Sequence, residues 1–332
     1  MIGIKLLGAG MYLPPKIVDN EDFTKIVDTS DEWITKRTGI KRRHLSEGEY
    51  TWSMGLKAAK NAIENAKINP LDIDMIIATT VSADFAFPSV SNIIQGKLEA
   101  KNAFGIDISC ACAGFVYGLD MASRYIATND DVKTVLIVSP ENVTKTVDYS
   151  DRSTCVLFGD GAGAVVVTAG GEPLYSYLGT DGTGAELLYA HLYPASNGFT
   201  DSEKAKENQK AFPNETGRYM YMDGPEVYKF AIKAMPEAME KACKKAGIKP
   251  SDLDLIIPHQ ANIRIIDTAI KNLGVDKEKV YVNIKETGNI SAACIPVCLS
   301  QLIEQGKLKP GQKVGMVGFG AGLIYGAAVL TV

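Results

Sequence analysis

AKINPLDIDMII (Ala66–Ile77) returns 180 residues later as AGIKPSDLDLII (Ala246–Ile257). The first Ala, the following Ile, the Pro, both Asp residues and the final Ile pair coincide in the two copies. Each copy is typical of the end of a helix, a turn that contains proline, and then an apolar run of the kind that forms a β-strand. The chain therefore contains an internal α/β repeat.

Two shorter repeated motifs follow in the same order in both halves. ISCAC (Ile108–Cys112) resembles ISAAC (Ile290–Cys294), and GAVVVT (163–168) resembles GAAVLT (326–331). A chance match of one motif does not preserve the order of three. We therefore expect two similar halves, residues 1–170 and 171–332, packed around a pseudo-two-fold axis.

Hydrophobic spacing predicts the class of each half. Apolar residues at intervals of three and four predict helices over Ala113–Ala127 and Asn262–Leu273. Near-continuous apolar runs at Ile73–Ala78, Val135–Val138 and Leu253–Ile257 are typical of strands in sheets that helices cover on both faces. The fold class is α/β. The stretch 188–216 has no counterpart in the first half and is expected to be an excursion over a site.

Composition excludes several classes of protein. The 332 residues are 46% hydrophobic and 22% charged, which suits about two globular domains. Lys and Arg number 35 against 39 Asp and Glu, a net charge of −4, so bulk charge does not favour a nucleic-acid partner. No apolar run approaches the ~18 residues of a membrane span, and the N-terminus lacks the pattern of a signal peptide. We expect a cytoplasmic protein with no membrane partner.

The chain has six cysteines and three histidines, so each can be considered individually as a candidate site residue. The six cysteines form no CxxC pair and no cluster with zinc spacing, so no metal site is expected. Cys112 follows an apolar strand and opens a helix, where the helix dipole is expected to lower the pKa of its thiol and make it nucleophilic. A small buried cysteine is the alternative for an isolated residue of this kind.

Two polar residues occupy comparable strand ends in the second half. His259 follows the repeated strand in PHQAN, and Asn289 precedes the helix that corresponds to the Cys112 helix. Singly, they would be a structural histidine and a helix cap. Together with Cys112 they form a candidate Cys-His-Asn site at the seam between the halves. The glycine-rich stretch FGDGAGA (158–164) is not a P-loop and predicts a tight turn between strands, so NAD or ATP binding is disfavoured.

At this point the sequence resembles the β-ketoacyl-acyl-carrier-protein synthase III family of condensing enzymes. The motifs that carry the resemblance run in family order along almost the whole chain: TSDEWITKRTGIKRRH (29–44), FPSVSN (87–92), DISCACAGFVYGL (107–119), DRSTCVLFGDGAGAVVV (151–167), PHQANIRI (258–265), GNISAACIP (288–296) and FGAGLIYGAAVL (319–330). The resemblance implies a thiolase-like fold, with two βαβαβ-type halves in an αβαβα core.

The same resemblance implies the reaction and the roles of the residues. An acyl-CoA primer would acylate Cys112, and His259 and Asn289 would stabilise the enolate formed when malonyl-acyl-carrier protein loses CO₂. Backbone N–H groups of Cys112 and Ala321 would form the oxyanion hole, although relatives commonly have Gly at the second position. No bound cofactor is implied, because the CoA thioester is itself the substrate.

Further positions are assigned to the two substrates and to a second subunit. Similarity assigns CoA binding to Trp33, Arg37, Arg152, Gly224, Ala261 and Asn262. Pro225 stands where many relatives have Asn. Arg264 and Lys271 would contact the acidic carrier protein, and Phe87 would reach the acyl pocket of the partner in a homodimer.

Three alternatives stay open at the level of sequence. A related condensing enzyme or acyltransferase of secondary metabolism would share these motifs. A papain-like protease shares the order Cys, His, Asn, but it lacks the repeat and has a different nucleophile context. A non-catalytic CoA binder would need none of the three residues.

Overall fold

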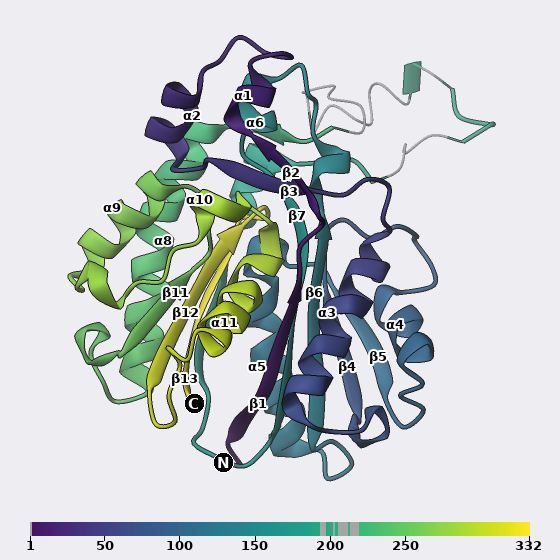
Figure 1. Cartoon of the computed structure of the whole chain (residues 1–332), viewed down its shortest axis with the longest axis vertical. Helices are drawn as coiled ribbons and strands as arrows, with labels where there is room; N and C mark the ends of the chain where they lie inside the picture. The colour runs from purple at the N-terminus through teal and green to yellow at the C-terminus, as the bar shows by residue number, and fades with distance from the viewer. Residues whose placement is uncertain (1, 193–196, 202, 205–211, 213–218) are drawn as a thin grey trace.

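Two β-sheets and the helices between and around them form the molecule (Figure 1). The computed structural model describes residues 2–192, 197–201, 203–204, 212 and 219–332. Most of the expected excursion at 188–216 lies outside the described residues. The predicted α/β class is confirmed.

The first sheet has five strands in the order β1-β7-β6-β4-β5. The strands are β1 (Ile4–Tyr12), β4 (Met75–Thr79), β5 (Phe104–Ile108), β6 (Thr134–Asn142) and β7 (Asp160–Ala169). β4 runs parallel to β5 and β6, whereas β7 is antiparallel to both β6 and β1. All five residues of β4 are buried, as the apolar run predicts for a strand covered on both faces.

The second sheet has four strands in the order β11-β12-β13-β8 and repeats this arrangement. Its strands are β8 (Tyr175–Thr180), β11 (Leu255–Pro258), β12 (Lys313–Gly320) and β13 (Ile324–Thr331). β11 is parallel to β12, and β13 is antiparallel to β12 and β8. Where β5 lies in the first sheet, the second has a single parallel bridge from Ile256 to Val280.

Helices make the other three layers. α3 (Thr51–Ala66) and α4 (Val90–Leu98) cover the outer face of the first sheet, and α8 (Gly224–Lys245) and α9 (Ile263–Leu273) cover the second. α5 (Gly114–Thr128) and α11 (Cys294–Glu304) lie between the sheets. Short elements complete the chain: β2 (Lys16–Asp19), α1 (Asn20–Phe23), α2 (Asp31–Thr38), β3 (Arg42–Leu45), α6 (Arg152–Cys155), β9 (Leu188–Tyr189), β10 (Tyr221–Met222) and α10 (Ile284–Thr287).

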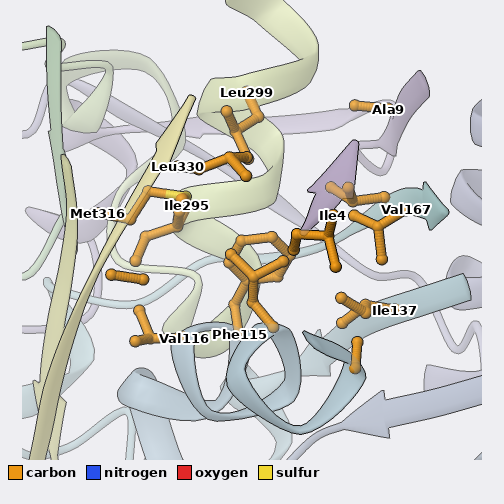
Figure 2. Close-up of a cluster of buried hydrophobic side chains, with 14 of the residues drawn as sticks. Ile4, Ala9, Phe115, Val116, Ile137, Val167, Ile295, Leu299, Met316 and Leu330 are labelled. Carbon is orange, nitrogen blue, oxygen red and sulfur yellow. The ribbon is translucent and has the colours of Figure 1, made fainter. Parts of the chain in front are cut away.

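The middle layer joins the halves through apolar side chains. Figure 2 shows Phe115 and Val116 of α5 facing Ile295 and Leu299 of α11, with strand residues from both sheets around them. Phe115 is fully buried, and burial of a side chain of this size contributes roughly 1.5–3 kcal/mol. The core between the sheets therefore fixes the position of the two helices that begin at the seam.

The structure corrects the alignment of one pair of repeated motifs. ISCAC and ISAAC align by letters at an offset of 182, but the equivalent 3₁₀ turns are η2 (Ala111–Ala113) and η7 (Ser291–Ala293). Ala111 and Ser291, the first residue of each turn, share a left-handed backbone with φ 43° and 50°. Cys112 is thus equivalent to Ala292, at the same offset of 180 as the opening repeat, and not to Cys294.

The prediction of a tight turn at FGDGAGA is also wrong. Residues 160–164 lie inside β7, which pairs with β1 and β6. A Cβ on Gly163 would lie 2.7 Å from the ring of Pro296 in α11, and one on Gly161 would lie 2.8 Å from Leu13. The glycines here allow close packing of the strand against its neighbours rather than a reversal of the chain. Within the described part of the chain, no helix has the length and apolar character needed to cross a membrane.

Candidate active site

A cavity of about 1210 Å³ lies where loops from both halves meet. Its wall includes Cys112, His259, Asn289 and Ala321. The structure therefore brings the candidate Cys-His-Asn residues together in one cavity. Cys112 and His259 follow β5 and β11, whereas Asn289 lies between α10 and η7 and does not follow a strand, so its predicted place at a strand end is wrong.

Cys112 lies in the middle of η2, on the strained turn that begins at Ala111. Two glycines of β12 make room for this turn. A Cβ on Gly320 would lie 2.7 Å from the Cys112 backbone nitrogen, and one on Gly318 would lie 3.0 Å from its carbonyl oxygen. The turn of the first half that carries Cys112 thus lies directly against the end of β12 in the second half.

Burial raises the pKa of the Cys112 thiol, which is the opposite of the predicted direction. The helix N-terminus was expected to lower it, but desolvation raises the pKa of Cys112 to about 12, and the nearby Glu141 adds to this increase. An ionised thiol would be placed in a site with little water, which disfavours the charged form. The resting group is therefore a neutral thiol at neutral pH.

His259 is held at the end of β11. Its backbone N–H donates to the Val317 carbonyl at 2.7 Å, and its ring meets Phe319 edge-on, with centroids 5.6 Å apart. Burial lowers the pKa of His259 to about 3, so the imidazole is neutral. Nδ1 is buried and has no hydrogen-bond partner among the described residues. A buried acceptor without a partner costs less than a buried N–H, which favours the tautomer with the proton on Nε2.

Asn289 is oriented by its own turn. Its side-chain Oδ1 accepts the Ser291 N–H at 2.9 Å, and its backbone bonds to Leu157 and Gly159 of the first half. Because the carbonyl end of the amide is occupied, the NH₂ end is the one that can donate into the cavity.

Gln260 connects the segments that carry His259 and Asn289, and the sequence did not single it out. Its Oε1 accepts the backbone N–H groups of Asn283 and Ile284 at 3.0 and 3.2 Å, and its Nε2 donates to the Pro258 carbonyl at 2.7 Å. Gln260 is fully buried. The one indication of this role in the sequence was the place of Gln260 directly after His259 in the PHQAN motif.

Ser291 and Glu141 are two further residues that sequence reasoning missed. The Ser291 hydroxyl lies 3.4 Å from the Cys112 Sγ and donates to Glu141 Oε1 at 2.9 Å. Glu141 is fully buried near the end of β6. A charged residue three positions after the Val135–Val138 run was a visible signal, but only the fold places it near Cys112.

The cavity mouth carries Trp33 between two arginines. Ser30 caps α2 by accepting the Trp33 N–H at 3.1 Å, and Gly39 ends the helix in a left-handed conformation. Trp33 and Arg37 are four residues apart and share one helix face, which places the Arg37 guanidinium 4.9 Å from the indole centre. Arg152 of α6 lies at 4.8 Å from the same ring. A flat aromatic ring with two cations suits a nucleotide with phosphates.

The other predicted contact residues divide into two groups. Gly224, Ala261, Asn262 and Arg264 line the cavity. Phe87 and Lys271 are not among its lining residues. Phe87 is 86% exposed, while Lys271 lies on the solvent side of α9, two turns beyond Arg264.

The basic run at 36–43 does not act as one surface. Arg37 lines the cavity, whereas Arg43 is fully buried and bonds to Asn20 Oδ1 at 2.7 Å and to the Val156 carbonyl. Arg43 packs over Phe23 beneath the N-terminal segment, so the run does not form one solvated surface.

The fold and the site together define a class: a thiolase-like acyltransferase of the condensing type, with cysteine, histidine and asparagine in one cavity between two related halves. Family models described as 3-oxoacyl-[acyl-carrier-protein (ACP)] synthase III and its C-terminal part match residues 106–188 and 243–332. The chain belongs to the 3-oxoacyl-[acyl-carrier-protein] synthase III family.

Similar proteins extend over the full length. The chain is 46% identical over 332 residues to a β-ketoacyl-[acyl-carrier-protein] synthase III of Clostridium acetobutylicum, covering 99% of both chains. It resembles the crystal structure of 3-oxoacyl-[acyl-carrier-protein] synthase III from Aquifex aeolicus, with TM-score 0.90, 41% identity and coverage of 99% and 100%. It also resembles the priming β-ketosynthase of the R1128 polyketide pathway, with TM-score 0.88, 35% identity and coverage of 99% and 96%. Family membership excludes the papain-like protease.

Proposed function

We propose that this enzyme starts fatty-acid elongation in the cytoplasm by condensing an acyl-CoA primer with malonyl-acyl-carrier protein. Products would be β-ketoacyl-acyl-carrier protein, CoA and CO₂. The observation that carries the proposal is the meeting of Cys112, His259 and Asn289 in one cavity whose mouth holds Trp33, Arg37 and Arg152. A related priming enzyme of secondary metabolism is the second candidate, because the R1128 ketosynthase has the same fold at 35% identity.

Acylation of Cys112 is the first half-reaction. The sulfur attacks the primer thioester, and the carbon–sulfur bond to CoA breaks as CoA leaves. A sulfur nucleophile suits this exchange because it is also a good leaving group in the second half-reaction.

Backbone N–H groups of Cys112 and Ala321 would hold the tetrahedral oxyanion. Among the described non-glycine residues, positive φ occurs at Lys67, Glu99, Ala111 and Ser291. Ala321 thus has an ordinary backbone, and Ala is compatible with a role that needs only its N–H.

Condensation is the second half-reaction. Loss of CO₂ from the malonyl group places negative charge on its thioester oxygen. The Nε2–H of neutral His259 and the NH₂ of Asn289 would donate to that oxygen. Both are uncharged donors held by the surrounding backbone, so they need little rearrangement when the charge develops. The enolate carbon then attacks the acyl group on Cys112, and the sulfur leaves.

The proposed binding roles follow the cavity from its mouth. Trp33 and Arg152 would hold the adenine and Arg37 the phosphates, while Gly224, Ala261 and Asn262 would lie along the pantetheine arm. Arg264 and Lys271 are seven residues apart on α9, hence about 10 Å apart along one face. That spacing suits the acidic surface of a carrier protein. We expect no permanently bound cofactor and no metal.

The proposed assembly is a homodimer. Phe87 is a large apolar side chain that stands 86% exposed beside Phe85, which is 43% exposed. Exposed aromatic residues close together are typical of an interface. In a dimer Phe87 would close the partner's acyl pocket.

A panel of acyl-CoA primers, with and without malonyl-acyl-carrier protein, tests the proposal. Wild type should gain one acyl group on the Cys112 peptide by mass spectrometry and form β-ketoacyl product. Cys112→Ser should form no product, while Cys243→Ser, a buried cysteine of α8 distant from the cavity wall, should retain activity. Absence of acyl-enzyme with every primer would contradict the proposal.

A further inference from the structure

A chain of hydrogen bonds leads from the Cys112 thiol into the protein. Cys112 Sγ lies 3.4 Å from Ser291 Oγ, and Ser291 Oγ lies 2.9 Å from Glu141 Oε1. Cys112 and Glu141 belong to the first half, whereas Ser291 belongs to the second. The chain is buried and ends on a carboxyl group that the two half-reactions above do not use.

The second oxygen of Glu141 is fully occupied by other donors. Oε2 accepts Thr80 Oγ1 at 3.1 Å, the Val81 N–H at 3.3 Å and Ser82 Oγ at 2.5 Å. A carboxylate with donors on both oxygens is held in one orientation. Among the residues that the structure describes, Ser291 is the one donor to Oε1, which is therefore held at a fixed place.

The direction of the chain follows from the single proton of the Ser291 hydroxyl. Because that proton is donated to the Glu141 carboxylate, the serine oxygen presents a lone pair to Cys112 and accepts its S–H. The arrangement is that of a thiol whose proton already points along a path to a base.

The charges around Glu141 favour a proton at the end of this path. Its charge raises the pKa of the Cys112 and Cys294 thiols, and no described lysine or arginine forms an ion pair with it; Lys145, four residues further along, pairs with Asp84. Burial raises the pKa of Glu141, so the carboxylate is a better proton acceptor than an exposed glutamate. Neutral His259, whose pKa burial lowers to about 3, is a much weaker base.

We propose that Ser291 and Glu141 form a proton relay that serves the acylation of Cys112. Ser291 contacts the reacting sulfur, and Glu141 acts through it as a positioning residue and temporary proton store. This inference rests on the proposed acylation by acyl-CoA and adds the proton path to it.

The relay balances within one acylation. As Sγ forms its bond to the thioester carbon, the thiol proton passes to Ser291 Oγ and the serine proton passes to Glu141 Oε1. The carbon–sulfur bond to CoA then breaks with its electron pair on the CoA sulfur. That sulfur is bound to the same carbon as Sγ, so Ser291 can return a proton to it while Glu141 returns one to Ser291. The products are acyl-Cys112 and CoA thiol, and Glu141 is again a carboxylate.

The shape of a pH profile distinguishes a relay from a structural role. Iodoacetamide alkylation of Cys112 is measured in a Cys110→Ala background, because Cys110 is nearby and partly exposed. With the relay, the rate should be nearly flat at neutral pH and fall in acid as Glu141 gains a proton. In Glu141→Gln the acid limb should vanish, and the rate should rise about tenfold per pH unit as thiolate forms without help. Acylation by acyl-CoA at pH 7 should fall about tenfold or more.

Two variants separate the relay from damage to the fold. Ser291→Ala should lose as much acylation as Glu141→Gln, and the double variant should lose no more than either. Alanine fits this backbone, because Ala111 adopts the same left-handed conformation in the equivalent turn. Thr80→Val removes one of the three bonds to Oε2 and leaves the Ser291 bond, so it should keep an acid limb, moved to higher pH because a bond that lowers the pKa of Glu141 is lost.

Each result decides between the claims. A Glu141→Gln profile parallel to that of wild type overturns the relay, as does a Thr80→Val profile that matches Glu141→Gln. If wild type shows the alkylation profile but accepts no acyl-CoA, the relay stands and the proposed function fails. If wild type is acylated and Glu141→Gln is acylated equally fast, the function stands and the relay fails.

Discussion

The Arg152 guanidinium lies over the Trp33 indole ring, 4.8 Å from its centre, and so joins α6 to α2 at the cavity mouth. Arg152 is also anchored by a hydrogen bond from Nη1 to the Asp28 carbonyl at 2.6 Å. At this distance the guanidinium is in direct contact with the indole, so a flat base can stack on this face of Trp33 only if Arg152 moves aside. Trp33 and Arg152 each lie in the first turn of a short helix that begins at a polar cap.

Trp33 fluorescence should therefore report CoA binding. The chain has two tryptophans, and Trp52 stacks on Tyr50 away from the cavity wall. In Trp52→Phe, titration with CoA should change the remaining emission. Trp33→Ala should raise KM for acyl-CoA about tenfold, with kcat changed less, since one stacking contact is worth about 1 kcal/mol or more. Unchanged emission of Trp52→Phe at saturating CoA would contradict the assignment.

His259→Ala and Asn289→Ala should separate the two half-reactions. Each variant loses one donor to the enolate oxygen, so CO₂ release from malonyl-acyl-carrier protein should fall about 10²–10³-fold. Self-acylation should stay within about tenfold of wild type, because neither side chain is the nucleophile. Intact mass measures the acyl-enzyme, and CO₂ release measures decarboxylation. Equal loss of both steps would refute the division of roles.

Gly320→Ala should disturb the nucleophile turn. The new Cβ would lie 2.7 Å from the Cys112 nitrogen and 2.8 Å from the Ala111 Cβ, so η2 must shift. We expect the free energy of unfolding to fall by about 1–3 kcal/mol and acylation to fall more steeply than that loss of stability alone explains.

Gly96→Ala is the matched control for that variant. Gly96 lies inside α4, and nothing approaches within 4 Å of a Cβ built on it. Alanine there should stabilise the protein by about 0.5–1 kcal/mol and leave acylation unchanged. Denaturant unfolding and acyl-enzyme formation are measured for both. A Gly320→Ala protein with wild-type acylation would show that the close approach has no catalytic consequence.

His259 should make stability depend on pH below neutrality. Its pKa is about 3 in the folded protein against 6.5 for the free side chain, so the unfolded chain binds a proton first as pH falls. The stabilisation is complete above about pH 6.5 and is lost toward pH 3. Between pH 7 and 4.5 this one group should lower the free energy of unfolding by about 2–3 kcal/mol.

His259→Gln provides the comparison, since glutamine does not titrate. Unfolding free energies of both proteins are measured over that range. From pH 7 to 4.5 the free energy of unfolding of the wild type should fall by about 2–3 kcal/mol more than that of His259→Gln. A constant difference would mean that the imidazole is hydrated or charged in the native state.

Much of the architecture could be predicted because local patterns repeat. Proline turns, apolar runs and helix periodicity are properties of neighbouring residues, and their order identified an α/β protein with two similar halves. The thiolase-like core was implied by the resemblance of the motifs to a known family. The exceptions have local causes too. The glycines of 158–164 were interpreted as a turn, because a glycine that relieves a contact with Pro296 looks, in sequence, like one that bends the chain.

Residue types at the candidate site were visible in the sequence, but their states were not. Cys112, His259 and Asn289 stand in motifs, whereas the neutral thiol, the neutral imidazole and the bond from Ser291 to Glu141 depend on burial and on contacts across the halves. Chain order alone determined the class of fold and the identity of the reactive groups. Tertiary structure decided their protonation and their partners, because desolvation and hydrogen bonding arise only when distant segments are brought together.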